Sequence, residues 1–384
     1  MDGSQVTTGV RSSDPSVGDD TGGMTLNRKP IDALCDIPSV FDVAAGFCDP
    51  DTARGFLETL IWPSGPFCPF CGSFHVWRFR AAGRTSRPGL HECADCNSQF
   101  TVTTRTPLHS TNLPLVTWIM ALYLIVTSSK GIASPVLARW LGVSQPTAWK
   151  MEHALRELMD RRAEDEPALG GVVEIDTKAV GGAPKYQRHV YHPPGRGSDK
   201  PVVLIAVERG GQVRAAVVPG EARADIEPVI TAAVDPAAHL MSDQDKAVGA
   251  VGQGFAAHDT VKHSARQYAR KGGMGKPKIH SNTAESFGSQ VERAQVGVFH
   301  QFSDPLLQRY IDEIAFRWNH TVREPYQDSR GRRRLRTGPA PFLAQLADLL
   351  RHAVGRQVRR SQSGGLRWPL PIAPGFRLAP SAPA

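Results

Sequence analysis

Length, composition and charge already exclude several classes of protein. The chain has 384 residues, enough for two or three domains of ordinary size. No run approaches the roughly 18 to 20 apolar residues that span a bilayer, and the N-terminus lacks a basic start followed by an apolar stretch, so we expect a cytoplasmic protein. The 45 Lys and Arg exceed the 37 Asp and Glu, which gives a net charge of +8 and favours a polyanionic partner such as nucleic acid.

The N-terminal quarter predicts a tail followed by a small metal-dependent unit. Residues 1–30 are rich in Ser, Gly, Asp and Thr, bury little apolar surface and are expected to be a disordered tail. Residues 31–110 predict a short helical segment and then two C-x-x-C pairs among aromatic and β-branched residues. Such a segment is too small to hold a core of its own, which is the usual condition for a structural metal.

The cysteines supply the strongest local signal in the chain. Two tight turns of thiolates suit the tetrahedral geometry that Zn²⁺ prefers. The ligands of one structural zinc ion are therefore predicted to be Cys68, Cys71, Cys93 and Cys96. The alternative is that these are unligated core cysteines, but burial does not explain paired spacing. His75 and His91 lie close enough to replace a thiolate, whereas Cys35 and Cys48 are expected only to pack.

Residues 111–165 predict a helix-turn-helix that binds DNA. An amphipathic helix ends at Gly142, and Ser144 is placed to cap a second helix whose first turn accepts Pro146. This second helix could enter a major groove with its outward side chains, predicted to be Gln145, Thr147, Ala148 and Lys150. An ordinary helical hairpin is the alternative.

Residues 170–325 change to strand patterns and then return to helix. Runs such as "VVEI", "VVLIAVER" and "VRAAVVP" are followed by a helical "DIEPVITAAV" and a further strand, "AHLM", before two more helical segments. This order predicts a mixed sheet flanked by helices, so the fold class is multidomain α+β. Residues 326–384 are basic and rich in Pro and Arg, and we expect this C-terminal segment to be partly disordered.

Three acids in this region are candidates for divalent metal ions. Alternation places Glu174, Asp176 and Lys178 on one face of a strand, while Asp243 ends a later strand and Glu285 lies in a helix. Carboxylates from separate segments are what two ions need around a phosphodiester. Taken singly, each acid could instead be a salt-bridge partner, a turn residue or part of a solvated helix face.

The order of motifs resembles the zinc-ribbon transposases of bacterial insertion sequences, of the ISXO type in the DDE superfamily. The resemblance covers roughly residues 40 to 320 and includes "WPSGPFCPFCGS", "LARWLGVSQPTAWKM", "EIDTKAVGG", "SDQDKAV" and "HSNTAESF". It implies an RNase H-like catalytic domain whose triad maps to Asp176, Asp243 and Glu285, with Asp245 as a solvated or helix-starting residue. It also implies two Mg²⁺ or Mn²⁺ ions and a homo-oligomer that pairs the terminal inverted repeats and attacks target DNA.

The chain departs from the family pattern beside this triad. The family usually has Glu directly after the first aspartate, an aromatic residue two positions further on and Trp three positions after the glutamate. This chain has Thr177, Ala179 and Gly288 there. Many members also have Lys seven positions after the glutamate, where this chain has Glu292, with Arg293 beside it as a candidate DNA contact.

The expected function is therefore metal-dependent DNA cleavage and strand transfer at the ends of an insertion sequence. Two alternatives stay open, and the first of them is motivated by Gly288 and Glu292 beside the triad. One is a catalytically impaired DNA-binding relative or regulator. The other is a metal-dependent nuclease of RNase H-like fold that cuts strands without joining them.

Overall fold

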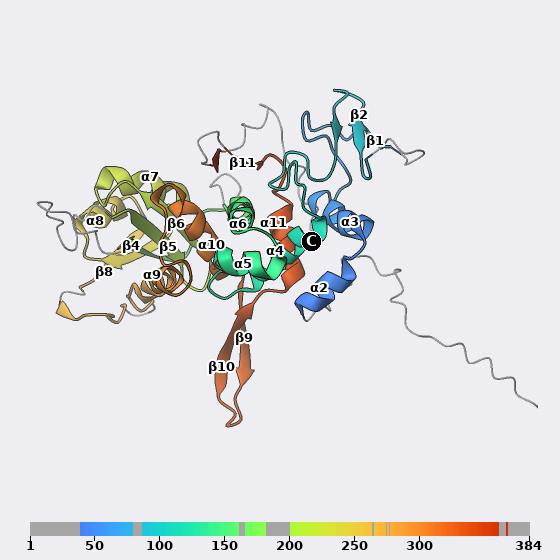
Figure 1. Ribbon diagram of the computed structural model, residues 1–384. Helices are drawn as coiled ribbons and strands as arrows, with labels where there is room; N and C mark the ends of the chain where they lie inside the picture. The colour runs from blue at the N-terminus through green and yellow to red at the C-terminus, as the bar shows by residue number, and fades with distance from the viewer. Residues whose placement is uncertain are drawn as a thin grey trace, which may run out of the picture.

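A computed structural model describes most of the chain (Figure 1). The described residues are 39–79, 87–160, 166–181, 200–262, 265–273, 275, 277–360 and 366–367. The predicted disordered tail, Cys35 and most of the last two dozen residues lie outside these ranges. Among the described helices, none combines the length and the apolar character that crossing a bilayer requires.

Two capped helices and a small sheet form the first unit. Helix α2 (Val40–Gly46) begins at a capping box in which Ser39 and Asp42 bond each other's backbone N–H, and α3 (Pro50–Ile61) begins at Asp49, whose carboxylate accepts from Thr52 N. The following antiparallel sheet consists of β1 (Val76–Arg78), β2 (His91–Cys93) and β3 (Gln99–Phe100). Its strands are very short, so the sheet depends for its shape on the cysteine turns before β1 and between β2 and β3.

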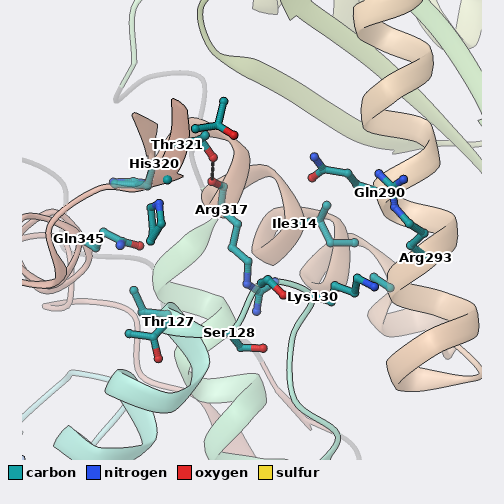
Figure 2. Close-up of a pocket in the computed structure, with 16 residues that line it drawn as sticks. Thr127, Ser128, Lys130, Gln290, Arg293, Ile314, Arg317, His320, Thr321 and Gln345 are labelled. Carbon is teal, nitrogen blue, oxygen red and sulfur yellow. Dashed lines mark hydrogen bonds between the residues drawn. The ribbon is translucent and has the colours of Figure 1, made fainter. Parts of the chain in front are cut away.

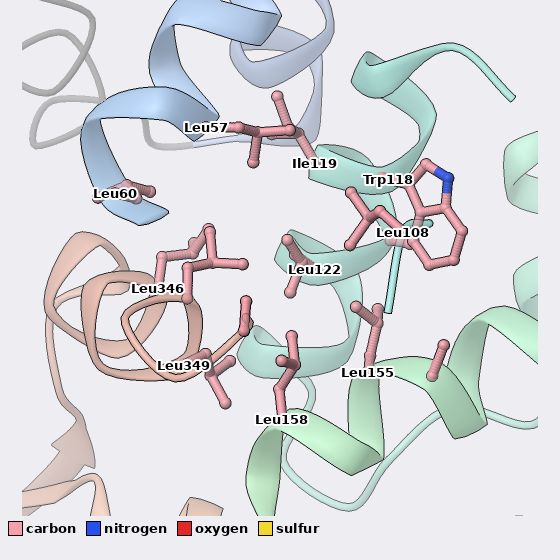
Figure 3. Close-up of a cluster of buried hydrophobic side chains, with 14 of the residues drawn as sticks. Leu57, Leu60, Leu108, Trp118, Ile119, Leu122, Leu155, Leu158, Leu346 and Leu349 are labelled. Carbon is pink, nitrogen blue, oxygen red and sulfur yellow. The ribbon is translucent and has the colours of Figure 1, made fainter. Parts of the chain in front are cut away.

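A helical core follows, and a segment near the C-terminal end of the chain packs into it. Helix α4 (Leu115–Thr127) precedes α5 (Ser134–Leu141) and α6 (Gln145–Met159). Figure 3 shows leucines of α3, α4 and α6 meeting Leu346 and Leu349 of α11 (Phe342–Leu350), and all of them are buried in one cluster. Residues 342–354 are thus ordered within this core, a difference from the partly disordered C-terminal segment expected from residue 326. The apolar face of "FLAQLADLL" explains the difference, because it can bury Leu346, Leu349 and Leu350 together.

The second unit is the predicted mixed sheet. Its five strands run in the order β6 (Val213–Val218), β5 (Val202–Glu208), β4 (Val172–Ala179), β7 (His239–Asp243) and β8 (Ala257–Val261). Strands β4, β5 and β6 pair antiparallel, while β7 and β8 add in parallel to β4. The parallel step requires a crossover, which α7 (Arg223–Ala233) supplies. Strand β8 was not predicted, because "AHDTV" is short and only half-buried.

Helices cover both faces of this sheet. Helices α7 and α8 (Lys246–Gly252) pack on one face with Val173, Ile175 and Leu204. The other face, with Val203, Ile205 and Val207, is covered by α9 (Asn282–Ala294) and α10 (Leu307–Asn319). A π-helical turn, η3 (Gln295–Phe299), and a 3₁₀ turn, η4 (Asp304–Leu306), connect these two helices. Strand β4 therefore lies in the middle of a sheet with both faces covered.

Buried ion pairs join the two units through α6 and α10. Nε of Arg156 donates to Glu313 at 2.6 Å, and Arg309 donates to Glu157 at 2.9 Å. Although burial raises the pKa of Glu313, the guanidinium groups of Arg156 and Arg317 hold it below its usual value. All of residues 151–159 of α6 are buried as a result, so only the first turns of this helix face solvent.

After α10 the chain forms a two-stranded hairpin of β9 (Thr321–Gln327) and β10 (Arg333–Pro339), which projects from the body of the molecule in Figure 1. It returns to α11 and then to a last short pair, β11 (Arg359–Arg360) and β12 (Leu366–Arg367). The hairpin was not predicted, because its sequence contains Pro, Gly and many arginines instead of a clear alternation of apolar and polar residues.

Candidate functional site

Four cysteines meet at the tips of two equivalent turns in the first unit. In each turn the first cysteine receives a backbone hydrogen bond from the residue after the second: Gly72 N donates to Cys68 O at 2.9 Å, and Asn97 N donates to Cys93 O at 3.0 Å. Gly72 and Asn97 both have positive φ, 80° and 55°, which closes each turn tightly enough to point two sulfurs the same way.

The sulfur positions match a closed tetrahedral metal site. The Sγ atoms of Cys68 and Cys96 lie 3.5 Å apart, and those of Cys71 and Cys93 lie 3.6 Å apart. Zinc–sulfur bonds of about 2.3 Å in a tetrahedron place sulfurs roughly 3.8 Å from each other. The hydroxyl of Ser98 lowers the pKa of the Cys96 thiol to about 6, so one ligand is ready as a thiolate, whereas burial raises that of Cys68 to about 12. The four-cysteine prediction is confirmed as a cluster.

The other cysteines and histidines of this region do not join the cluster. His91 is buried against Trp62 and Phe100, and its Nδ1 lies 3.1 Å from Gly89 O. His75 is exposed beside Asp95. Cys48 is also exposed, so its predicted packing role is wrong. It follows a short helix whose buried residue is Val43, which leaves the cysteine on the solvent side.

Two of the three candidate acids lie side by side in the large sheet. Strands β4 and β7 pair in parallel with Ile175 opposite Ser242, so the next residues along each strand, Asp176 and Asp243, are neighbours. Glu285 lies in the first turn of α9, which packs over β4. The carboxylates of Asp176, Asp243 and Glu285, here called the acid cluster, are thus supplied by three adjacent elements.

The acids repel one another and are partly withdrawn from water. The pKa of Asp176 is raised to about 6, chiefly by burial and also by the negative charges of Glu285 and Asp243, while the N–H of Thr177 and the charge of Lys178 oppose the shift. The cluster is more open than the cysteine site: within the part of the chain that the structure describes, the four cysteines are the one group of three or more His, Cys, Asp or Glu side chains whose ligand atoms all lie within 4.8 Å of one another. An open group of carboxylates leaves room for substrate oxygens around a bound cation.

Asp245, two residues beyond Asp243, is a helix cap and not a member of the acid cluster. Its carboxylate accepts from Ala247 N at 2.8 Å and from Val248 N at 3.1 Å, and so it caps α8. The prediction that Asp245 starts a helix is confirmed. The carboxylate of Asp243, by contrast, accepts from Gln244 N at 2.6 Å and caps no helix among the described residues. Asp243 ends strand β7 beside Asp176.

Glu174 fixes the helix that carries Glu285. This fully buried carboxylate accepts from Thr283 N at 2.6 Å and from Ala284 N at 3.2 Å, at the first turn of α9. Its other oxygen receives Arg209 Nε at 2.8 Å. Burial lowers the pKa of the neighbouring His280, so Arg209 is the cation that compensates Glu174. The sequence placed Glu174 on the face of Asp176, but no local signal showed that it would cap a helix more than 100 residues away.

Lys178 accounts for two of the departures from the family pattern. Its Nζ lies 3.0 Å from Glu292 on α9, and its stem passes over Gly288, where an added Cβ would lie 3.1 Å from the Lys178 Cδ. A larger residue at position 288 would displace this stem. Thr177, on the opposite face of the strand, donates to Glu221 at 3.1 Å, and Ala179 is exposed at the strand end. Position 292 therefore carries the anion of an ion pair whose cation is on β4.

The predicted DNA-contacting residues fall in two places. Ser144 caps α6 and accepts from Thr147 N, and Gln145 and Lys150 are exposed. Ala148 is wholly buried, so its predicted outward position is wrong. It follows Thr147 on a helix that packs against α5, and its methyl group faces the core cluster. Arg293 lies far from this turn, at the end of α9.

Arg293 borders a cleft of about 560 Å³ between the two units. The cleft is lined by the loop after α4, by α9 and α10, and by the base of the β9–β10 hairpin. Figure 2 shows Lys130, Arg293, Arg317 and His320 around it. Arg317 is engaged with Glu313, and His320 with Asp348. We call this the basic cleft. Its lining comes from segments far apart in the sequence, which is why sequence reasoning found only Arg293.

Comparison with known families locates both parts of the molecule. Residues 168–319 match the ISXO2-like transposase domain, and residues 49–99 match the transposase zinc-ribbon domain. The first match spans the large sheet and the helices that cover it, and the second contains all four cysteines of the tetrahedral site. A search of curated proteins finds no match.

Proposed function

We infer that this chain, which belongs to the zinc-ribbon insertion-sequence transposases of the DDE type, cuts and joins DNA at the acid cluster. The observation that carries the proposal is the parallel pairing of β4 with β7, which brings Asp176 beside Asp243 under the helix of Glu285. The family match supports this class of enzyme, and the adjacency of the three residues supports their assignment as its catalytic carboxylates.

The acid cluster suits two Mg²⁺ or Mn²⁺ ions. Carboxylate oxygens are the ligands that these ions prefer, and the raised pKa of Asp176 reflects burial and like-charge repulsion that a bound cation relieves. When bound, the ions would activate water and stabilise charge on the phosphate. Glu174 on β4 fixes the first turn of α9, which carries Glu285, and this contact supports the placing of Glu285 over the strand of Asp176.

The proposed reaction has two steps at phosphorus. In the first, water attacks the phosphodiester at the element end, the P–O3′ bond breaks, and a free 3′ hydroxyl and a 5′ phosphate result. In the second, that 3′ hydroxyl attacks a target phosphodiester, forms a new P–O3′ bond and releases a target 3′ hydroxyl. Each step breaks one bond and forms one, so neither needs an oxidant, a reductant or a covalent protein intermediate.

DNA recognition is assigned to the N-terminal unit. The zinc ribbon, which has a structural zinc ion as its centre, and the α5–α6 pair would bind the terminal inverted repeats, with Gln145, Thr147 and Lys150 at the exposed start of α6. Arg293 would contact DNA nearer the acids. Two or more copies of the chain would pair the two ends in the cytoplasm, where bacterial DNA lies.

The test uses the purified full chain and a duplex that carries the DNA bordering its own gene, with and without Mg²⁺. Asp176→Ala, Asp243→Ala and Glu285→Ala are each expected to abolish cleavage and joining while DNA binding is kept. Glu227→Ala, which removes an exposed acid on α7, is the matched control and should react like wild type.

Three results would decide against parts of this proposal. Binding without cleavage in the wild type would favour a regulatory DNA-binding relative. Cleavage without joined products would favour a nuclease. Equal activity of wild type and all three acid variants would remove the acid cluster from the mechanism.

A further inference from the structure

The β9–β10 hairpin is built as an arm that stands outside every hydrophobic core of the described chain. Within residues 321–339, each side chain that the structure describes is exposed except at Asp328 and Gly338. Leu335 is 66% exposed and Tyr326 is 48% exposed. A two-stranded ribbon without a packed face is only marginally stable in water. Its exposed apolar residues and its isolation indicate that it functions against a partner.

The charge of the hairpin points to a polyanion. The sequence of the hairpin contains two acidic residues and six arginines. The arginines are Arg323, Arg330, Arg332, Arg333, Arg334 and Arg336. Asp328 is occupied by the turn: it accepts from the backbone N–H groups of Arg330 and Arg332 and pairs with the Arg332 and Arg334 side chains. Among the described residues, no acid pairs with Arg330 or Arg333. Asp328 thus fixes the turn, while Arg330 and Arg333 remain available to bind an anionic partner.

The basic cleft continues this positive surface toward the acid cluster. The base of the hairpin, at Thr321 and Thr337, forms one wall of the cleft, and Lys130 and Arg293 are exposed at its border (Figure 2). Neither cation has an acidic partner within the described residues. Arg293 follows Glu285 by eight residues on α9, which corresponds to about 12 Å along the helix axis. A DNA strand held in the cleft would therefore lie next to the proposed site of cleavage.

The same surface also connects to the recognition region. Lys130 lies in the short link between α4 and α5, and the buried ion pairs of α6 with α10 fix that region against the catalytic sheet. The start of α6 is tied to this link, because Gln145 Nε2 donates to Ser134 Oγ at 2.9 Å. A ribbon of seven residues per strand, about 23 Å long, is narrow enough to enter a major groove.

We propose that the β9–β10 hairpin and the basic cleft form one DNA-binding surface that holds the element end between the recognition helix and the acid cluster. The proposal rests on the proposed function, because it takes DNA as the substrate. It goes further in assigning the path of that DNA and the residues that hold it, Arg330 and Arg333 on the arm with Lys130 and Arg293 at the cleft. The hairpin lies beyond the end of the matched transposase domain.

The experiment compares three forms of the full chain in DNA binding across a range of salt concentrations. The arm variant is Arg330→Gln with Arg333→Gln, and the cleft variant is Lys130→Gln with Arg293→Gln. The control is Arg223→Gln, which removes an exposed arginine from α7 on the opposite face of the sheet. The probes are the duplex bordering the gene of the chain and a duplex of unrelated sequence and equal length. Zinc content and the unfolding midpoint verify that each variant is folded.

Both double variants are expected to bind the bordering duplex at least tenfold more weakly near physiological salt. The slope of log affinity against log salt should fall by up to about two, because each lost phosphate contact removes about 0.9. The control should change neither affinity nor slope appreciably.

Several outcomes would overturn the proposal while leaving the proposed function in place. An unchanged affinity and slope in both variants, in a wild type that binds and cuts, would remove the arm and the cleft from DNA binding. Loss of self-association with unchanged DNA affinity would make the arm a contact between copies of the chain. Loss confined to capture of the target duplex would overturn the assignment to the element end. A wild type that neither binds nor cuts would refute the proposed function itself.

Discussion

The four cysteines of the zinc ribbon and the three carboxylates of the acid cluster are both small groups of side chains that could bind metal ions, yet they are assembled in opposite ways. The cysteines sit on two local turns with the same backbone hydrogen bonds, and their sulfurs meet within 4.8 Å. The acids come from two strands and a helix, and their arrangement depends on the buried Glu174 and its partly exposed partner Arg209. The first site is closed and suits a structural ion, whereas the second is open and suits a substrate.

The largest expected effect follows from breaking the closed site. Cys68→Ser removes a buried ligand, and structural zinc in such sites contributes on the order of 10 kcal/mol to folding near pH 7. We expect loss of bound zinc and of ordered structure in residues 66–100. Metal content and the reactivity of the remaining thiols measure this directly. Cys48→Ser, at an exposed cysteine outside the cluster, is the matched control and should keep one zinc ion per chain.

The acid cluster should instead be sensitive to a residue that holds no metal. Glu174→Gln leaves Arg209 without its buried carboxylate and weakens the cap of α9, and breaking a buried pair in this way costs about 3 to 5 kcal/mol. Urea unfolding measures this loss of stability. The Glu174→Gln variant should also bind Mn²⁺ more weakly than wild type. Glu227→Gln, at an exposed pair, should change stability by less than about 1 kcal/mol. Unchanged stability in Glu174→Gln would show that α9 is positioned by other contacts.

The buried ion pairs between α6 and α10 predict that the stability of the protein depends on pH. Burial raises the pKa of Glu152 on α6 to about 8, well above its usual value of 4.5. Between these values the folded chain binds a proton that the unfolded chain does not, so this group favours folding at low pH and its contribution is lost as the pH rises toward 8.

Glu152→Gln should remove a slope of up to about 1.4 kcal/mol per pH unit in this range. The comparison is cleanest between pH 7.5 and 8, because burial lowers the pKa of the adjacent His153 to about 2 and the unfolded histidine, with its ordinary pKa of 6.5, is also almost entirely neutral there. Parallel stability curves for wild type and variant would contradict the assignment.

The smallest effect is expected at the ion pair beside the acids. Lys178 and Glu292 are partly exposed, so Glu292→Ala should cost less than about 1 kcal/mol of stability. Because it frees a cation near the cleaved strand, it should strengthen DNA binding and steepen its salt dependence. The double exchange Lys178→Glu with Glu292→Lys restores the pair with reversed charges and should recover stability. A loss of binding in Glu292→Ala would indicate that the pair itself is needed.

The same contrast explains what could be predicted from the sequence. The cysteine turns, the α5–α6 pair with its Ser144 cap and strands β4 to β7 are encoded in short segments, and these predictions are confirmed. Glu174 as a helix cap, the basic cleft and the packing of α11 depend on contacts between residues 50 to 300 positions apart. Local patterns carry no information about such contacts. The roles of Asp176, Asp243 and Glu285 in catalysis remain a prediction drawn from family resemblance and from their adjacency.

The central claim, that the acid cluster is an assembled divalent metal site, is tested most directly by counting bound Mn²⁺ in the zinc-loaded chain by electron paramagnetic resonance. Asp243→Ala and Asp245→Ala form the decisive pair, because the two aspartates are close in sequence but only Asp243 lies beside Asp176. The account predicts two Mn²⁺ per chain in wild type and in Asp245→Ala, and loss of at least one in Asp243→Ala. Equal Mn²⁺ binding in wild type and Asp243→Ala would contradict it.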